Sequence, residues 1–488
     1  MTGSSGQSGF LPGEKPVPVQ REGPRTVYRL PSTDLGNSSF LLADADRGEA
    51  VVVDPTRDVG RYVRLAEAKS LRIHWVLDTH IHNDFLSGGR ELATVSGASF
   101  GIGKGSGLSY PHHEFSPHET ISWGGGRIVV LPSPGHTPEH VSYLLEDRRG
   151  APWALFSGGS LMVGFASRPD LLGPEMTYPL VREEFRTLHE RYRHLPGRLP
   201  VYPTHGGGSF CGTAGGDSYA TTLSTERREN PLLRARSPSE FLQEYLHPAP
   251  FPAYYRRMKA WNQAGRPDLG LDLPMLRGLS PKEVEALGRK EDVTLIDVRS
   301  LRDFDRGHIP GSVSLPASGA FSAWAGWLRD PEQGFVIVDA SERDRIRTQV
   351  GLLRIGYDRI LGYLEGGIPA FQEAGGELRR IPAVGMARVR RALEAGEPCL
   401  VLDVRNPSEA VAQHVPGSLN IPLPELEKRA REELDPRWDI YVHCEVGYRS
   451  GVATSLLERL GFSHLYHVQE GPGEWDAPRT ERPRRRRH

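Results

Sequence analysis

The chain has 488 residues, 38% of them hydrophobic, and at about 150 residues per domain this length corresponds to roughly three domains. Its 60 basic and 61 acidic side chains leave a net charge of −1, which gives no overall electrostatic basis for binding nucleic acid or a membrane surface. No apolar run approaches the ~20 residues of a membrane span, and the three cysteines, without a CxxC pair, exclude a disulfide framework. We therefore expect a multidomain protein of the reducing cytoplasm, for which a homo-oligomer is allowed.

The N-terminal leader, residues 1–24, is rich in Gly, Ser and Pro and lacks a signal-peptide pattern, so we predict no ordered structure for it. Structure is expected to begin near Thr26. An extended stretch at 39–42, a strand ending at Asp54, a helix over about 59–69 and a strand running into His80 follow in order. Strand, helix, strand indicates an α/β arrangement.

Histidine-bearing turns follow several of these apolar strands. His80, His82 and Asp84 lie in the segment HIHND, and His136 (SPGHTPEH) and His205 (YPTHGGGSFCG) lie in similar turns. Imidazoles at i and i+2 just past a strand can point to one side of a loop, and a His and Asp set of this kind is typical of a metal site. These five residues are the candidate metal ligands.

The segments around these turns also resemble a known family. They are VVVDP, THIHND, SPGHTPEH, FSGGSL, SRPDL, YPTHGGGSFCG and NPLLR. Together they are similar to the metallo-β-lactamase fold, and more narrowly to persulfide dioxygenases, including those fused to rhodanese domains. The resemblance covers residues 25–268. It implies an αββα fold and a non-haem Fe(II) site that oxidises a low-molecular-weight persulfide to sulfite.

Two positions depart from the family pattern. Phe85 replaces the last histidine of HxHxDH, and Gly159 stands where a TGDTL-like turn supplies a metal-binding aspartate. The resemblance implies iron ligands at His80, His136 and position 159, so the carboxylate is missing; the remaining neutral imidazoles suit zinc. Three alternatives stay open: a dioxygenase with an altered ligand set including Asp84, a thioester metallohydrolase, and a non-catalytic, sulfide-responsive binding protein.

The C-terminal half contains an internal sequence repeat. The segment TLIDVRSLRDFDRGHIPGSVSLP from Thr294 matches LVLDVRNPSEAVAQHVPGSLNIP from Leu400 without gaps. Strands alternating with helices predict two α/β domains, at 275–378 and 382–480, followed by a basic tail at 481–488. Within each DVR segment the Asp and Arg are expected to form an ion pair at a strand end. Both copies resemble rhodanese domains.

The second copy contains the candidate nucleophile. An apolar strand stops at Cys444, a loop from Cys444 to Arg449 that contains Gly447 follows, and a helix is expected from Ser450, so the thiol faces a helix N-terminus that stabilises the thiolate. The order strand, CxxGxRS, helix resembles the rhodanese active-site loop. This implies attack by Cys444 on a sulfane sulfur, with Arg449 and the backbone of the intervening residues stabilising the anion; those substrate-binding residues are Glu445, Val446, Gly447 and Tyr448.

The expected substrates are thiosulfate and low-molecular-weight thiols and persulfides. Glu445 makes the loop less cationic, which favours a persulfide or thiol over thiosulfate. In the first copy we place Ala340 at the position of Cys444, and its loop ASERDR has no thiol. We therefore expect only the second copy to form a persulfide.

Overall fold

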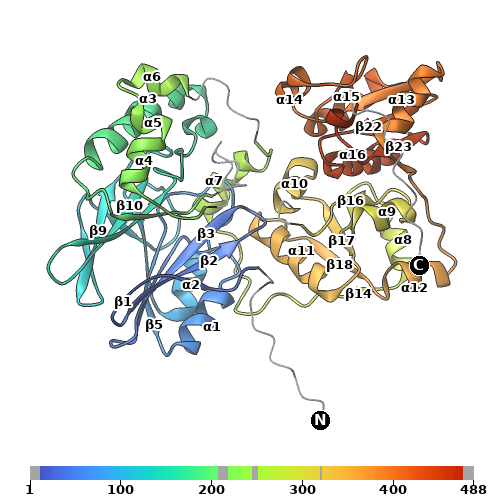
Figure 1. The fold of residues 1–488 in the computed structure, drawn as a ribbon. Coiled ribbons are helices and arrows are strands. Elements are labelled where there is room, and N and C mark those ends of the chain that lie inside the picture. Colours follow the sequence, from blue (N-terminus) through green and yellow to red (C-terminus); the bar gives the residue numbers. More distant parts are fainter. Residues whose placement is uncertain (1–10, 12, 207–217, 245–250, 319–320, 476–488) are drawn as a thin grey trace, which may run out of the picture. The chain divides into compact units, whose positions relative to one another are not determined.

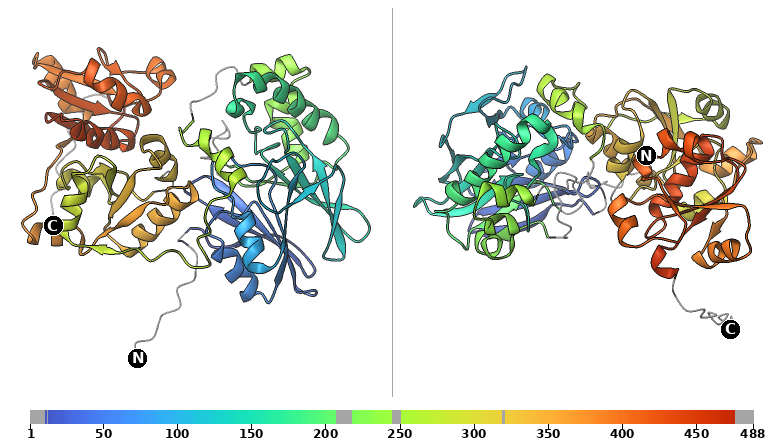
Figure 2. Two further views of the ribbon diagram at one scale, coloured as in Figure 1. Left: turned by 180° about the vertical axis from the view of Figure 1, so that it is seen from behind. Right: turned by 90° about the horizontal axis from the view of Figure 1, so that it is seen from above.

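The computed structural model describes residues 11, 13–206, 218–244, 251–318 and 321–475, and the chain divides into two compact units (Figures 1 and 2). The first unit comprises Met1–Met275, Ser318–Pro331 and Gln349–Asp358, and the second comprises Leu276–Ala317, Glu332–Thr348 and Arg359–His488. No helix among the described residues is both long and apolar enough to span a membrane. The predicted basic tail, 481–488, lies outside the described residues.

The first sheet of the first unit has seven strands in chain order. They are β1 (Val17–Glu22), β2 (Arg25–Ser32), β3 (Asn37–Asp44), β4 (Glu49–Val53), β5 (Arg72–Leu77), β6 (Ser99–Gly103) and β7 (His113–Phe115). Neighbours are antiparallel from β1 to β4 and parallel from β4 to β7. The parallel strands end on one edge, where the loop after β5 carries the HIHND segment.

The second sheet has the order β13-β12-β11-β10-β9-β8. Its strands are β8 (Thr120–Trp123), β9 (Gly126–Pro132), β10 (Val141–Glu146), β11 (Pro152–Gly158), β12 (Pro200–Pro203) and β13 (Thr221–Thr222). Only β11 and β12 among these pairs run parallel. The turns after β9, β11 and β12 hold His136, Gly159 and His205.

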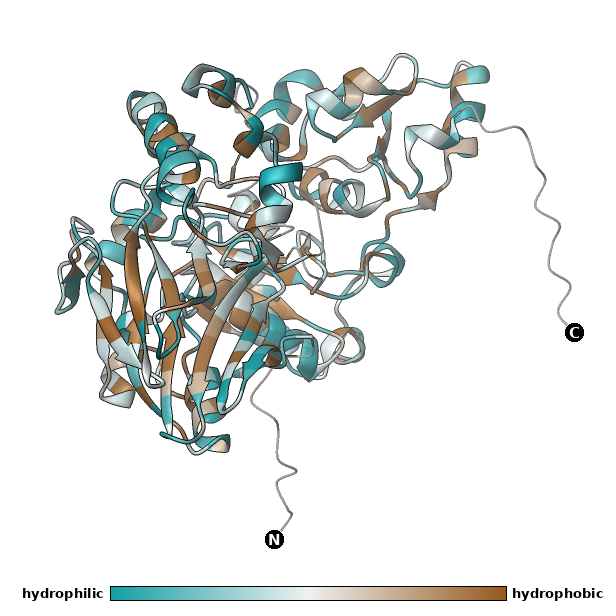
Figure 3. Cartoon of the chain, turned by 60° about the vertical axis from the view of Figure 1, so that its left-hand side comes forward, coloured by the Kyte–Doolittle hydropathy of each residue, from teal (hydrophilic) through white to brown (hydrophobic). Residues whose placement is uncertain are grey.

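Helices cover the outer face of each sheet. Helices α1 (Gly60–Ala68) and α2 (Gly89–Ser96) lie on the first sheet; α3 (Pro174–Arg186), α4 (Leu223–Glu229), α5 (Pro231–Arg234) and α6 (Pro238–Gln243) lie on the second, with η1 (Pro169–Leu172) and η2 (Thr187–Arg191) beside α3. A third apolar cluster fills the space between the sheets. The strands carry long hydrophobic runs while the covering helices mix hydrophobic and hydrophilic residues (Figure 3). The predicted αββα architecture is confirmed. The unit also contains α7 (Tyr255–Ala264) and α10 (Phe321–Leu328).

The prediction of an unstructured leader is wrong for its last part. Strand β1 (Val17–Glu22) pairs with β2 in an antiparallel register, and Glu14 is buried against Arg61 and Arg354. A Pro- and Gly-rich composition lowers the intrinsic tendency to fold, but strand pairing with a β-sheet edge outweighs it here.

The second unit contains two five-stranded parallel sheets, one for each repeat, with orders β14-β18-β17-β15-β16 and β19-β23-β22-β20-β21. The first sheet comprises β14 (Gly278–Leu279), β15 (Val293–Asp297), β16 (Val313–Ser314), β17 (Gly334–Val338) and β18 (Ile360–Leu364). The second comprises β19 (Ala383–Val384), β20 (Cys399–Asp403), β21 (Leu419–Asn420), β22 (Asp439–His443) and β23 (Leu465–Val468). The identical order of the two sheets confirms the internal repeat.

Helices connect these parallel strands, as crossovers must. In the first repeat they are α8 (Pro281–Gly288), α9 (Leu301–Arg306), α11 (Glu342–Arg354) and α12 (Gly367–Glu373). In the second they are α13 (Met386–Glu394), α14 (Pro407–Ala412), η3 (Leu423–Glu425), α15 (Leu426–Glu433), α16 (Tyr448–Arg459) and η4 (Pro472–Glu474). The DVR ion pairs form as predicted, between Arg299 and Asp297 at 2.6 Å and between Arg405 and Asp403 at 2.8 Å.

The sheet register corrects the predicted position equivalent to Cys444. Asp297 pairs with Val338 in the first repeat and Asp403 pairs with His443 in the second. The next residue in each strand is therefore Asp339 and Cys444, so Asp339, not Ala340, stands at the position of the thiol. The difference of one residue arises because strand pairing sets the equivalent position: β17 ends at Val338 and β22 ends at His443, each directly before the residue in question.

Candidate functional site

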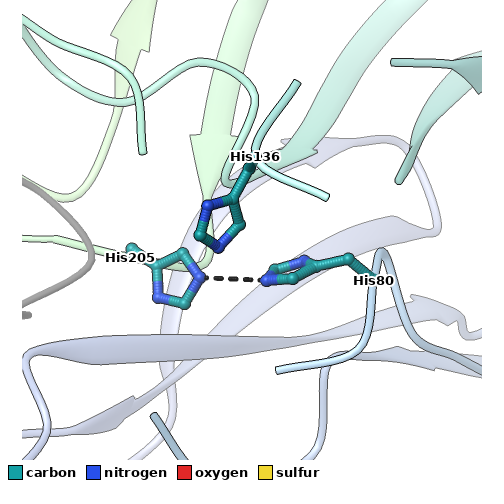
Figure 4. Close-up of side chains that lie close together, drawn as sticks. All are labelled: His80, His136 and His205. Carbon is teal, nitrogen blue, oxygen red and sulfur yellow. Dashed lines mark hydrogen bonds between the residues drawn. The ribbon is translucent and has the colours of Figure 1, made fainter. Parts of the chain in front are cut away.

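Three histidines converge in the first unit from separate loops. His80 follows β5, His136 lies between β9 and β10, and His205 follows β12. One ring nitrogen from each lies within 4.8 Å of the others, and the Nε2 atoms of His80 and His205 are 3.3 Å apart (Figure 4). All three side chains are fully buried. Each lies in a loop that directly follows a strand, so the ends of the strands bring the three imidazoles together.

The outer nitrogen of two of these imidazoles has an oxygen partner close by. His80 Nδ1 lies 2.8 Å from Thr79 Oγ1, and His136 Nδ1 lies 3.0 Å from the Arg168 carbonyl oxygen. A carbonyl only accepts, so His136 carries its proton on Nδ1. Its Nε2 is buried without a hydrogen-bond partner among the described residues. In a metal-binding histidine, one ring N–H donates to an outer acceptor and the lone pair of the other nitrogen faces the metal. His136 has this arrangement, with Nε2 as the nitrogen that can bind.

His205 is held by a carboxylate and an amide. Its Nδ1 lies 3.1 Å from Asp84 Oδ2 and 3.2 Å from Asn37 Oδ1, and Asn37 Nδ2 donates to the same Asp84 oxygen at 2.7 Å. Burial alone would raise the pKa of Asp84, but His205 and Asn37 lower it well below its ordinary value. Asp84 is thus an anion that orients His205.

Burial keeps the central imidazoles neutral. Desolvation, followed by the charge of neighbouring His205, lowers the pKa of His136 to about 3. Desolvation, with His82 and His136 next to it, lowers the pKa of His80 well below its ordinary value. Only neutral imidazole can donate a nitrogen lone pair to a metal, so His80 and His136 are in the metal-binding form at neutral pH.

His82 is oriented differently from the other three. Its Nε2 lies 3.2 Å from Asp54 Oδ1, and the Phe85 ring stacks on its imidazole at 4.1 Å between centroids. Burial opposes protonation, but Asp54 outweighs it and raises the pKa of His82. His82 belongs to two further groups of metal-ligating type, one with Asp84 and His205 and the other with Asp54 and Asp78.

The donor set fits a divalent transition metal with three nitrogen ligands. His80, His136 and His205 are buried and two are neutral by their shifted pKa values, and imidazole suits zinc as well as iron. Gly159 has no side-chain oxygen to contribute; its N–H donates to His140 Nε2 at 3.0 Å and its carbonyl oxygen accepts from Ser167 N–H at 2.9 Å. When bound, such a metal supplies a Lewis acid with open coordination positions.

Cys444 lies in the second unit, directly after β22. It is 1% exposed, and its Sγ lies 3.5 Å from the Ser450 hydroxyl. Gly447 precedes α16 with φ of +84°, and a Cβ at this position would lie 3.1 Å from the Gln469 carbonyl oxygen. The loop therefore requires glycine. The predicted order of strand, loop and helix is confirmed, but the helix begins at Tyr448, two residues before the expected Ser450, because Gly447 ends the loop.

Both arginines near the Cys444 loop are paired with carboxylates. Arg449 donates to Glu409 at 2.7 Å from each terminal nitrogen, and Arg405 donates to Glu445 at 3.1 Å as well as to Asp403. Arg449 also interacts electrostatically with Cys444. Of the other predicted loop residues, Val446 is exposed and Tyr448 is half-buried.

Comparisons with known proteins match both the histidine cluster's unit and the two repeats. The rhodanese-like domain model matches residues 280–374 and 386–478. Over 230 residues, or 44% of this chain, a hydroxyacylglutathione hydrolase of Acidiphilium cryptum is 31% identical, with 93% of its length covered. The chain belongs to the metallo-β-lactamase-fold family and carries two rhodanese-like domains.

Two further relatives support this assignment. The mitochondrial persulfide dioxygenase ETHE1 of Bos taurus is 28% identical over 200 residues, which cover 40% of this chain and 70% of that protein. The crystal structure of a metallo-beta-lactamase from Staphylococcus aureus aligns with a TM-score of 0.61 and 28% identity, covering 70% of this chain and 98% of that one. The aligned share is longer than the metallo-β-lactamase-like part alone.

Sequence reasoning missed one histidine of the metallo-β-lactamase-like unit. His140 is buried, stacks on His80 at 4.8 Å between centroids, accepts from Gly159 N–H and contacts Ser133 Oγ through Nδ1 at 2.8 Å. It fixes the Gly159 turn. The signal was its place in SPGHTPEH, four residues after His136.

Asp54 was recognised in sequence as a strand end, but its role was not. It accepts from the backbone N–H of Thr79 at 2.7 Å and from the Thr79 hydroxyl at 2.9 Å, and it also binds Thr204. Its φ of +49° is uncommon for a residue other than glycine. Asp54 therefore ties together the loops that carry His80 and His205.

Proposed function

We propose that the chain acts in sulfane-sulfur metabolism, as a sulfurtransferase that carries sulfur on Cys444. The observation that carries this proposal is the buried Cys444 Sγ beside the Ser450 hydroxyl, at the N-terminus of the twelve-residue helix α16. A helix N-terminus and a hydroxyl donor stabilise an anionic sulfur. The substrates are a sulfane-sulfur donor, such as thiosulfate or a low-molecular-weight persulfide, and a thiol acceptor.

The transfer takes two displacements without net oxidation. The Cys444 thiolate attacks the outer sulfur of the donor, the donor's sulfur–sulfur bond breaks with its electron pair going to the leaving thiolate or sulfite, and Cys444 becomes a persulfide anion. An acceptor thiolate then attacks the terminal sulfur. The bond to Cys444 Sγ breaks, the acceptor leaves as a persulfide, and the Cys444 thiolate is restored.

The metallo-β-lactamase-like unit is proposed to act on a persulfide as well. The resemblance to a persulfide dioxygenase and the three converging imidazoles support a metal-dependent oxidation of the persulfide to sulfite. His80, His136 and His205 would hold the metal, with iron(II) expected from the relative's chemistry and zinc suited to three nitrogens. A thioester hydrolase would need a second complete metal site, which Phe85 weakens. The few, widely spaced cysteines favour a reducing cytoplasm as its location.

Substitution of the cysteines tests the sulfurtransferase. Cys444→Ser is expected to abolish sulfur transfer from thiosulfate or glutathione persulfide to a thiol, and the gain of one sulfur atom by the Cys444 peptide should disappear from the mass spectrum. Cys399→Ser is the matched control, because burial raises the pKa of that thiol and keeps it unreactive. Retained transfer in Cys444→Ser would overturn the assignment.

A further inference from the structure

A histidine of the second repeat connects the Cys444 loop to the first repeat. His467 lies on β23 and is 1% exposed. Its Nε2 is 2.8 Å from the Gly447 carbonyl oxygen, in the loop, and its Nδ1 is 2.7 Å from Asp305 Oδ2. Asp305 lies on α9 of the first repeat and is 5% exposed. The sulfur loop is therefore two hydrogen bonds away from a carboxylate of the repeat that has no thiol.

The chemistry of the two contacts fixes the direction of the hydrogen bonds. A carbonyl oxygen can only accept, so His467 Nε2 is the donor to Gly447. An ionised carboxylate also only accepts, so His467 Nδ1 is the donor to Asp305 Oδ2. Both contacts are satisfied together when His467 carries both ring protons and Asp305 carries the negative charge. Loss of that charge removes the group that holds the imidazole in this orientation.

The Gly447 carbonyl in turn affects the hydroxyl beside Cys444. Ser450 Oγ lies 3.1 Å from Gly447 O, 3.0 Å from Val468 O and 3.5 Å from Cys444 Sγ, yet it has one proton to donate. Gly447 O already receives the Gly451 N–H at 3.1 Å. With His467 as a second donor, both lone pairs of that carbonyl are filled. The Ser450 hydroxyl is then left with two acceptors, Val468 O and Cys444 Sγ, and a hydrogen bond to an ionised acceptor is the stronger one, so an anionic sulfur attracts the proton.

We propose that Asp305 is a positioning residue for Cys444, acting through His467, Gly447 and Ser450. The inference rests on the proposed function, since it gives the thiol-free first repeat a part in sulfur transfer. Asp305 touches neither the sulfur nor a substrate. It keeps the loop carbonyl supplied with a donor and so leaves the Ser450 proton for the thiolate or the persulfide anion.

A second pair of residues between the repeats supplies a matched control. His308 Nε2 lies 3.0 Å from Glu458 Oε2, and His308 Nδ1 lies 2.9 Å from the Phe304 carbonyl oxygen. His308 is also buried, and its contact with Glu458 also joins a histidine of one repeat to a carboxylate of the other. Glu458, however, lies near the C-terminal end of α16, away from the loop. Its loss should weaken the same interface without altering the sulfur.

The test uses the full chain with Asp305→Ala, which removes the partner of His467 Nδ1 altogether, and with His467→Gln and His308→Gln. The first readout is the rate at which iodoacetamide alkylates the Cys444 peptide, followed by mass spectrometry across a pH series. The second is kcat and KM for sulfur transfer from glutathione persulfide to a thiol, with thermal unfolding to confirm folding. Asp305→Ala and His467→Gln are expected to move the alkylation midpoint to higher pH and to lower kcat roughly tenfold with KM little changed. His308→Gln should lower the unfolding temperature and change neither readout.

A double variant tests the route through the hydroxyl. Ser450→Ala should produce a similar shift in the alkylation midpoint, and adding Asp305→Ala to it should produce little more, because both changes act through the Ser450 hydroxyl. An unchanged profile in folded Asp305→Ala, or an equal shift in His308→Gln, would overturn the proposal. Absence of sulfur transfer in the unmodified chain would overturn the proposed function instead, and the alkylation profiles would still decide the role of Asp305.

Discussion

Arg449 and Glu409 form a two-pronged ion pair beside Cys444, with both guanidinium nitrogens 2.7 Å from the two carboxylate oxygens. The pair joins the first turn of α16 to α14. The hydrogen bond from Arg449 lowers the pKa of Glu409, so the carboxylate stays ionised. The positive charge near the sulfur is therefore largely balanced before any substrate binds.

Arg449→Ala should consequently slow sulfur transfer by less than the roughly 10²-fold typical of losing a dedicated anion-binding group. We expect about a tenfold fall in kcat/KM. Glu409→Gln should have the opposite effect and accelerate transfer, because it leaves the guanidinium free to interact with the anionic sulfur. Arg429→Ala, which removes an arginine paired with Glu425 and Glu433 in the same repeat, is the control. A loss beyond 10²-fold in folded Arg449→Ala would mean that Arg449 leaves Glu409 during the reaction.

The sequence was sufficient for what depends on local pattern. Apolar runs ending in turns located β5 and β22, and the Gly447 turn located the start of α16, because strand and helix periodicity are written in neighbouring residues. A family motif placed His80, His136 and His205 near each other. The αββα order followed from the same resemblance.

Contacts between distant segments were beyond the sequence. Glu409 and His467 are ordinary residues on a helix and a strand, and only the fold brings them to Arg449 and Gly447. The residue equivalent to Cys444 was predicted at Ala340 instead of Asp339 because strand pairing, not composition, sets the register. Strand β1 was missed because its partner, β2, supplies the order that its own sequence does not.

Arg354 should be essential to the stability of the first unit. It is fully buried and binds Glu14 at 2.7 Å, Asp34 at 2.6 Å and Asp58 at 2.8 Å. Arg354→Met leaves these carboxylates without their common partner, and we expect a loss of about 3–5 kcal/mol in the free energy of unfolding. Urea unfolding of the full chain measures it. Arg359→Met, which breaks an exposed pair with Asp292, should cost less than about 1 kcal/mol.

Asp339 should make the stability of the second unit depend on pH. Burial, partly offset by Arg345, raises the pKa of Asp339 to about 6, whereas an unfolded aspartate titrates near 3.9. Between these values the folded state binds more protons, so the free energy of unfolding falls as pH rises from about 4 to 6. In Asp339→Asn the free energy of unfolding should change less over this pH range, by about 1–2 kcal/mol after allowance for solvent screening. Parallel curves for the two proteins would contradict the expectation.

The final prediction concerns the carboxylate missing from the three-histidine cluster. Purified protein that is incubated with metal under anaerobic conditions should bind one divalent ion through His80, His136 and His205. It should retain zinc better than iron(II), because neutral nitrogens do not offset the charge of the metal and affinity rises toward zinc. His136→Ala should lose most of either metal. Stoichiometric metal in His136→Ala would show that the cluster is not the binding site.

Restoring the carboxylate requires room as well as the right residue. Gly158, not Gly159, has a positive φ, of +58°, so aspartate at 159 meets no backbone penalty of that kind. A Cβ there would, however, lie 2.8 Å from His136 Cδ2 and 2.8 Å from Ser167 Oγ. Gly159→Asp alone should therefore displace His136 and lower metal content. Gly159→Asp with Ser167→Gly removes the contacts with Ser167, so the new side chain can shift away from His136. This double variant should retain more iron(II), measured by elemental analysis after dialysis, than Ser167→Gly alone. Equal iron in the two would mean that an oxygen at position 159 does not reach the metal, and iron(II) held at stoichiometry by the unmodified chain would show that another residue already supplies that ligand.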